Sequence, residues 1–119
     1  MQYQSDYILR IIEQMGAALR EAFAQLRGGA GSEEPLALTE AAIGLVVDMD
    51  PKLFLRLSPQ SMVSFIEISG LDDRVVGKLI EALELEADIL DTEGNIVEAH
   101  VRREQARALQ DAVDPAHAN

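Results

Sequence analysis

Apolar residues near the start of the chain recur at alternating steps of four and three, and this spacing constrains the fold most. Such steps place side chains on one stripe of an α-helix. The members of this stripe are Ile8, Ile12, Met15, Leu19, Ala22 and Leu26. Asp6 is a good N-cap residue, and Gly28 with Gly29 ends the pattern. The spacing therefore predicts a first helix between Asp6 and Gly28.

Glycine and proline breaks divide the next part of the chain. Residues 28–34 read as a flexible connection, because three glycines fall within them. Pro35 suits the first turn of a second helix, which the apolar pattern carries to about Asp48. Residues 52–57 are long enough for one short turn of helix.

Cap and stop residues delimit three more helices. Ser58 stands before a proline and begins a helix that Gly70 ends. Asp72 caps the next helix, and Gly94 closes it. The pattern predicts a last helix over about residues 96–113.

These segments predict an all-α protein of about five helices packed as antiparallel hairpins. No segment alternates with a period of two, so we expect no strand. The hydrophobic fraction is 48% with 4% aromatic residues, which predicts a core of Leu, Ile, Val, Ala and Met. A chain of 119 residues suits one domain over residues 1–119, with a disordered tail near residues 114–119.

The charge of the chain is strongly negative and unevenly distributed. Net charge is -11, and residues 31–99 hold fifteen acids against four bases, whereas residues 1–30 hold three of each. Such a surface repels phosphate backbones and anionic lipid, so we expect no nucleic-acid partner. No apolar run approaches the length of a membrane span, and the polar start does not resemble a signal peptide. With no cysteine in the chain, these features predict a cytoplasmic protein that binds no membrane.

Residues 83–109 resemble one tetratricopeptide repeat. The residues that carry the resemblance are Ala87, Leu90, Gly94, Asn95, Glu98, Ala99, Ala106 and Leu109. It implies two helices in close contact, with Ala99 and Ala106 buried where they cross. Residues 34–45 resemble the second helix of the same repeat. The whole chain is similar to a family of small bacterial proteins catalogued only as a domain of unknown function, which implies a fold and no activity.

Catalytic and metal-binding patterns are weak in this sequence. The histidines are His100 and His117, and no serine lies in a nucleophile elbow, so we expect no enzyme and no cofactor. Acids at short spacing after Asp91 do not form a calcium loop, because Ile96 and Arg102 occupy the positions of its glycine and its bidentate acid. We expect these acids to serve at helix ends, and no metal site.

Four carboxylates form the predicted partner-binding face. They lie on one side of the fourth predicted long helix, opposite its apolar stripe. They are Glu81, Glu84, Asp88 and Asp91. In a tetratricopeptide repeat the matching positions line the concave ligand face, so the resemblance implies an acidic groove for a basic peptide or protein. The alternative is a solvated polar face.

Two readings of function follow. The first is a protein interaction or self-association module, in which the stripe from Ile8 to Leu26 acts as a coiled-coil seam between two copies. The alternative use of that seam is packing within one chain. The second reading is a small-molecule or metabolite binder with a pocket between helices. A row formed by His100, Arg103 and Arg107 is expected to pair with acids of a neighbouring helix.

Overall fold

Six α-helices make up most of residues 2–29 and 31–114, which a computed structural model of the chain describes. None of these residues forms a strand, so the all-α prediction is confirmed. The helices are α1 (Gln2–Arg27), α2 (Glu33–Gly44), α3 (Pro51–Phe54), α4 (Pro59–Ser69), α5 (Asp73–Thr92) and α6 (Ile96–Val113). The predicted disordered tail from residue 115 on, with His117, lies outside the described residues.

Helix ends with a strong local signal lie where the sequence predicts them. The Ser58 hydroxyl accepts a hydrogen bond from the Ser61 amide at the start of α4, and the Asp72 carboxylate accepts one from the Arg74 amide in α5. Gly70 and Gly94 have φ angles of 66° and 85°, in the left-handed region that favours glycine. These two turns set the directions of α4, α5 and α6.

Two helices differ from their predicted bounds. α1 begins at Gln2, so Asp6 lies inside the helix and is not its cap. An aspartate inside a helix costs at most about 0.7 kcal/mol in helix propensity, which a helix of this length tolerates. α2 begins two residues before Pro35, with Glu33 and Glu34 in its first turn, and it ends at Gly44 rather than near Asp48. The predicted connection at residues 28–34 is correspondingly shorter.

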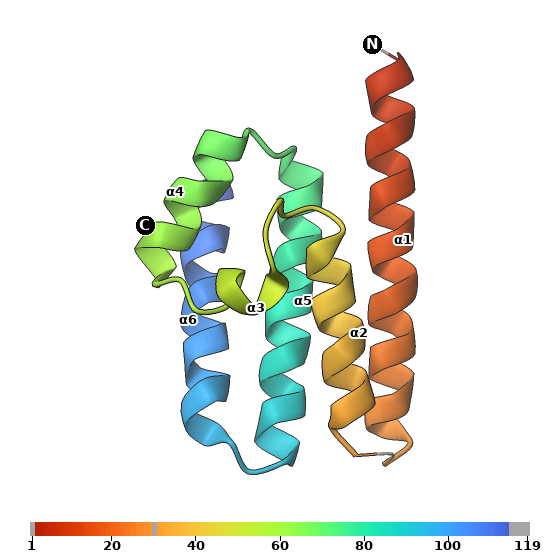
Figure 1. Ribbon diagram of the computed structural model, residues 1–119, viewed down its shortest axis with the longest axis vertical. Coiled ribbons are helices and arrows are strands. Elements are labelled where there is room, and N and C mark those ends of the chain that lie inside the picture. The colour runs from red at the N-terminus through yellow and green to blue at the C-terminus, as the bar shows by residue number, and fades with distance from the viewer. Residues whose placement is uncertain (1, 30, 115–119) are drawn as a thin grey trace.

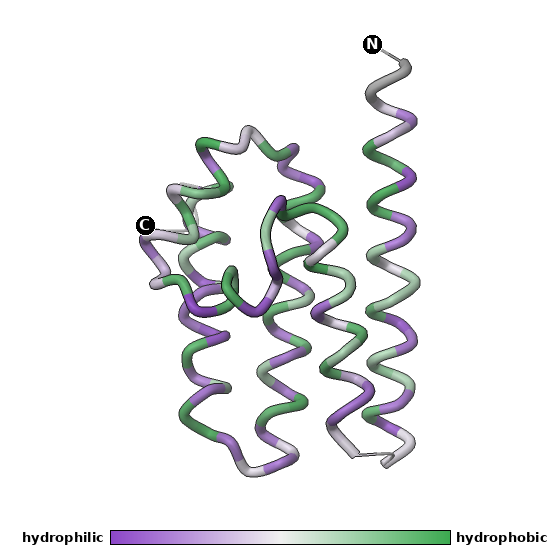
Figure 2. Tube along the Cα trace, in the orientation of Figure 1, coloured by the Kyte–Doolittle hydropathy of each residue, from purple (hydrophilic) through white to green (hydrophobic). Residues whose placement is uncertain are grey.

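The helices pack as two groups that share α5 (Figure 1). α2 lies against both α1 and α5, and α1 also contacts α5. α5 and α6 are joined by a short turn and run antiparallel, and α4 packs on α6. Hydrophobic and hydrophilic residues alternate along each helix in Figure 2, as expected for helices with one buried side. The finer likeness to tetratricopeptide packing stays a prediction.

The core consists mainly of aliphatic side chains and methionine, as predicted. Phe54 is fully buried, and its ring meets Phe65 edge to face at 5.6 Å between centroids. Ala99 and Ala106 are buried on α6, which confirms that small residues lie on its packed side. Within the described part of the chain, no helix is both long and apolar enough to span a bilayer.

Candidate functional site

The four predicted partner-binding carboxylates are all exposed on α5. Glu81, Glu84, Asp88 and Asp91 lie on the side opposite the buried residues of that helix. Exposure was expected from their spacing of three and four residues. Their surroundings differ, however, because α6 runs alongside and contributes bases.

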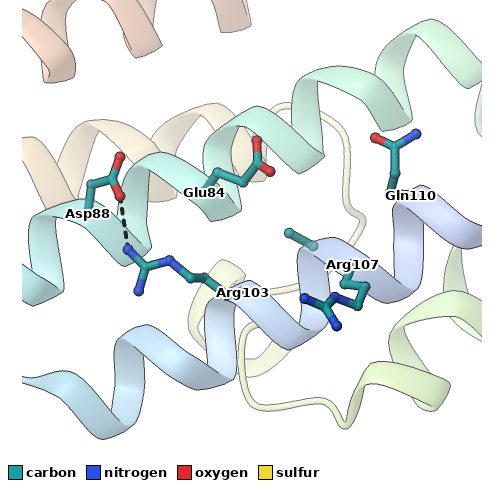
Figure 3. Close-up of a pocket in the computed structure, with 6 residues that line it drawn as sticks. Glu84, Asp88, Arg103, Arg107 and Gln110 are labelled. Atoms are coloured by element: carbon teal, nitrogen blue, oxygen red, sulfur yellow. Dashed lines mark hydrogen bonds and ion pairs between the residues drawn. The ribbon is translucent and has the colours of Figure 1, made fainter.

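A groove of about 500 Å³ lies between α5 and α6. Glu84 and Asp88 line it from α5, while Arg103 and Arg107 line it from α6 (Figure 3). Its remaining lining residues are Ala106, which is buried, and Gln110. The groove therefore carries mixed charge, rather than the purely acidic character expected from α5 alone.

Arg103 neutralises the part of the groove near the α5–α6 turn. Its Nη2 lies 3.0 Å from Asp88 Oδ1 and 2.6 Å from Asp91 Oδ2. These hydrogen bonds, chiefly the one to Asp91, raise the pKa of the Arg103 guanidinium. The predicted pairing of the basic row with acids of a neighbouring helix is thus confirmed for Arg103.

Glu84 and Arg107 lie one helical turn farther from the α5–α6 connection than Asp88 and Arg103. Among the described residues, neither forms an ion pair. Figure 3 shows Arg103 reaching across to Asp88, whereas the charged ends of Glu84 and Arg107 lie apart. Glu81 is engaged within α5 by Lys78, at 3.2 Å. The groove thus offers one acid and one base to an external ligand.

The predicted self-association stripe of α1 is placed largely inside the molecule. Met15, Leu19 and Ala22 are buried in the fold. Ile8, Ile12 and Leu26 are half-buried, and the first two pack against the main core. The central part of the stripe therefore packs within one chain, and only its ends retain exposed surface.

A buried polar network on α2, α5 and α6 was not predicted. Arg102 Nε donates to Glu86 Oε2 at 2.8 Å, and the two side chains are 9% and 3% exposed. The Thr39 hydroxyl lies 2.8 Å from Glu86 Oε1. The sequence held a signal for this pair, because Glu86 and Arg102 each fall on the apolar stripe of their helix, where a charge needs a partner.

The same network holds the segment that follows α3. Arg102 Nη1 donates to the Leu55 carbonyl at 3.1 Å. The Gln105 amide donates to the carbonyls of Leu55 and Leu57, at 2.8 and 2.9 Å. No buried side-chain nitrogen or oxygen among the described residues lacks a hydrogen-bond partner. The network is fully satisfied and fixes the α3–α4 connection onto α6.

Burial raises the pKa of the Glu86 carboxyl, and the hydrogen bonds from Arg102 and Thr39 oppose this effect in part. We expect Thr39→Val to raise this pKa further, because valine keeps the shape and loses the donor. A carboxyl whose pKa is raised by folding stabilises the fold at low pH, and this contribution is lost as pH rises through the folded pKa. The loss of stability in Thr39→Val should therefore be larger at neutral pH than at acid pH.

Carboxyl carbon shifts of Glu86, followed by NMR through a pH titration of both proteins, measure this effect. Urea denaturation at two pH values measures the accompanying change in stability. If Glu86 titrated together with the exposed glutamates in both proteins, the prediction of a raised pKa for its carboxyl would be wrong.

Two of the oxygen-bearing side chains in the cluster that begins at Asp91 serve structural roles. Asp91 pairs with Arg103, and Asn95 caps α6 by accepting a hydrogen bond from the Glu98 amide. His100 is exposed on α6. The described ranges contain no group of three side chains from His, Cys, Asp and Glu that could hold a metal ion.

No family model, curated protein or solved structure matches the chain. The resemblance to a tetratricopeptide repeat therefore rests on the sequence of residues 83–109 and of residues 34–45.

Proposed function

We propose that this protein is a non-catalytic, tetratricopeptide-like interaction module, and that the α5–α6 groove binds a segment of a partner protein. The observation that carries the proposal is the unpaired state of Glu84 and Arg107 on opposite walls of this groove. A partner segment that carries a base and an acid would pair with both.

The register of the hairpin explains why these two charges are available. Glu84 precedes Asp88 by four residues on α5, and Arg107 follows Arg103 by four on α6, so the two pairs occupy successive turns. Arg103 pairs with Asp88 and Asp91 on one turn of the hairpin. On the next turn, Glu84 and Arg107 remain unpaired among the described residues. A bound partner would exclude water there and strengthen both interactions.

A protein partner fits this groove better than a metabolite does. Glu84, Asp88, Arg103 and Arg107 are all exposed, so a small ligand would keep much of its surface in water. Sites for small molecules usually enclose most of the ligand. A peptide segment, by contrast, can extend along the groove and gain affinity from several exposed side chains.

The double charge swap Glu84→Lys/Arg107→Glu tests the proposal, because it reverses both charges and leaves the net charge at its original value. We expect the swapped protein to lose the partners that the wild type captures from a lysate of its own organism, identified by mass spectrometry. The wild-type complexes should also weaken markedly from low to physiological salt, where the screening length falls to about 8 Å.

The matched control is Arg20→Glu/Glu21→Lys, a charge swap at two exposed positions of α1. It should retain the partners and their salt dependence. Capture of the same partners by the α5–α6 swap, with helix content unchanged by circular dichroism, would exclude this groove as the binding site.

A further inference from the structure

α3 and α4 form one segment, residues 51–69, that is attached to the other helices at few places. The chain is not helical at residues 45–50 before this segment and at residues 70–72 after it, where Gly70 has a left-handed backbone. Among the described helices, α4 packs extensively on α6 only, and α3 packs on α2 (Figure 1). The other four helices contact one another in a set of pairs centred on α5. Their packing therefore does not depend on α3 or α4.

The attachment of this segment to α6 is partly polar. The buried Gln105 amide donates to the carbonyls of Leu55 and Leu57, and Arg102 donates a second hydrogen bond to the Leu55 carbonyl. Only one position of the segment satisfies all these groups, so the hydrogen bonds define that position closely. When the segment moves away, water can hydrogen-bond to the same groups, and each bond therefore contributes only a small net stabilisation.

Packing beneath α4 is also incomplete. A cleft of about 140 Å³ remains where α4 meets the start of α5 and the end of α6. Val63 and Ile66 line it from α4, Val76 lines it from α5, and Leu109 and Val113 line it from α6. Side chains that border such a gap lose part of the dispersion attraction that close packing provides. This gap lowers the free energy needed to separate α4 from α6.

We propose that residues 51–69 form a flap, which opens from α6 as one unit while α1, α2, α5 and α6 stay folded. Phe54 and Met62 are fully buried, so the closed form prevails and the open form is a minor population. Opening exposes these two side chains together with Leu109 of α6, an apolar surface that the closed molecule does not present. The flap contributes no residue to the α5–α6 groove, so this inference does not rest on the proposed function.

Native-state hydrogen exchange of the whole protein, followed by NMR at low urea concentrations, tests the flap. A unit that opens alone loses its amide protection before the rest of the molecule does. After correction for intrinsic rates, we expect the amides of Leu55 and of residues 62–69 to share one opening. They should exchange at least about tenfold faster than the most protected amides of α5. Equal protection of α4 and α5 would mean that the segment opens only when the whole molecule unfolds, and would overturn the inference.

Two variants separate opening of the flap from global unfolding. Gln105→Leu removes the donor to the Leu55 and Leu57 carbonyls, and it should speed exchange in α4 by about tenfold. Ala22→Gly weakens α1, whose contacts with α2 and α5 persist when the flap opens. It should speed exchange of the most protected α5 amides by about fivefold and leave α4 unchanged. The inference would also fail if Gln105→Leu left exchange in α4 unchanged, or if Ala22→Gly accelerated α4 and α5 equally.

Discussion

Replacing Arg102 with methionine should lower the free energy of unfolding by about 3–5 kcal/mol, the usual cost of breaking a buried ion pair. Methionine ends near the position of Arg102 Nε, so it is shorter but keeps the packing of the apolar part of the side chain. It removes the cation, however, and leaves the buried Glu86 carboxylate with Thr39 as its remaining hydrogen-bond donor. The unpaired charge, rather than a cavity, is therefore the expected cause.

Urea denaturation followed by circular dichroism measures the free energy of unfolding of Arg102→Met. A variant of the neighbouring Arg103 is the control. Arg103→Met removes a guanidinium that pairs with exposed acids, and it should cost about 1 kcal/mol or less. If Arg102→Met cost no more than Arg103→Met, the buried pair would not be the stabilising unit described above.

A double replacement separates the unpaired charge from the loss of packing. Glu86→Leu/Arg102→Met removes both charges at once and should recover most of the stability that Arg102→Met loses. The Leu55 carbonyl keeps a donor in this variant, because the Gln105 amide also donates to it at 2.8 Å. Both variants also remove the Arg102 donor that lies 3.2 Å from Gln105 Oε1, so a double variant as unstable as Arg102→Met would point to packing or to this buried oxygen instead of to the charge of Glu86.

The sequence predicts helix ends well where the signal is local. Ser58, Asp72, Gly70 and Gly94 act through hydrogen bonds or backbone angles within a few residues, so their roles can be read from the neighbouring positions. The end of α2 has no such signal. Its apolar pattern continues into Val46 and Val47, while the chain leaves the helix at Gly44 and turns toward α3. The chain folds back closely at that boundary, since a Cβ at Gly44 would lie 3.1 Å from Pro51 Cγ.

The candidate site was predicted in part for the same reason. Exposure of Glu84 and Asp88 follows from helical spacing within α5. The partner of Asp88 lies 15 residues away on α6, and the register of the hairpin determines which base meets which acid. The contact of Arg102 with the Leu55 carbonyl spans 47 residues, so no local pattern could have indicated it.

Phe54→Ala should destabilise the fold by about 3–5 kcal/mol, as expected for a large buried ring that leaves a cavity. Phe54 is the last residue of α3, a helix of four residues that contributes few other buried groups. The ring is fully buried and meets Phe65 edge to face. It therefore anchors the short segment between α2 and α4 to the core.

Two further variants, Leu53→Ala and Phe54→Leu, identify the cause of this loss of stability. Thermal and urea denaturation measure the stability of each. Leu53→Ala shortens an adjacent side chain that is half exposed, and it should change stability by about 0.5 kcal/mol or less. Phe54→Leu retains most of the volume and should cost about 1–2 kcal/mol, well below the alanine variant. If alanine and leucine at position 54 were equally destabilising, loss of the edge-to-face contact with Phe65 would outweigh the cavity. Equal stability of Phe54→Ala and Leu53→Ala would mean that α3 is dispensable to the core.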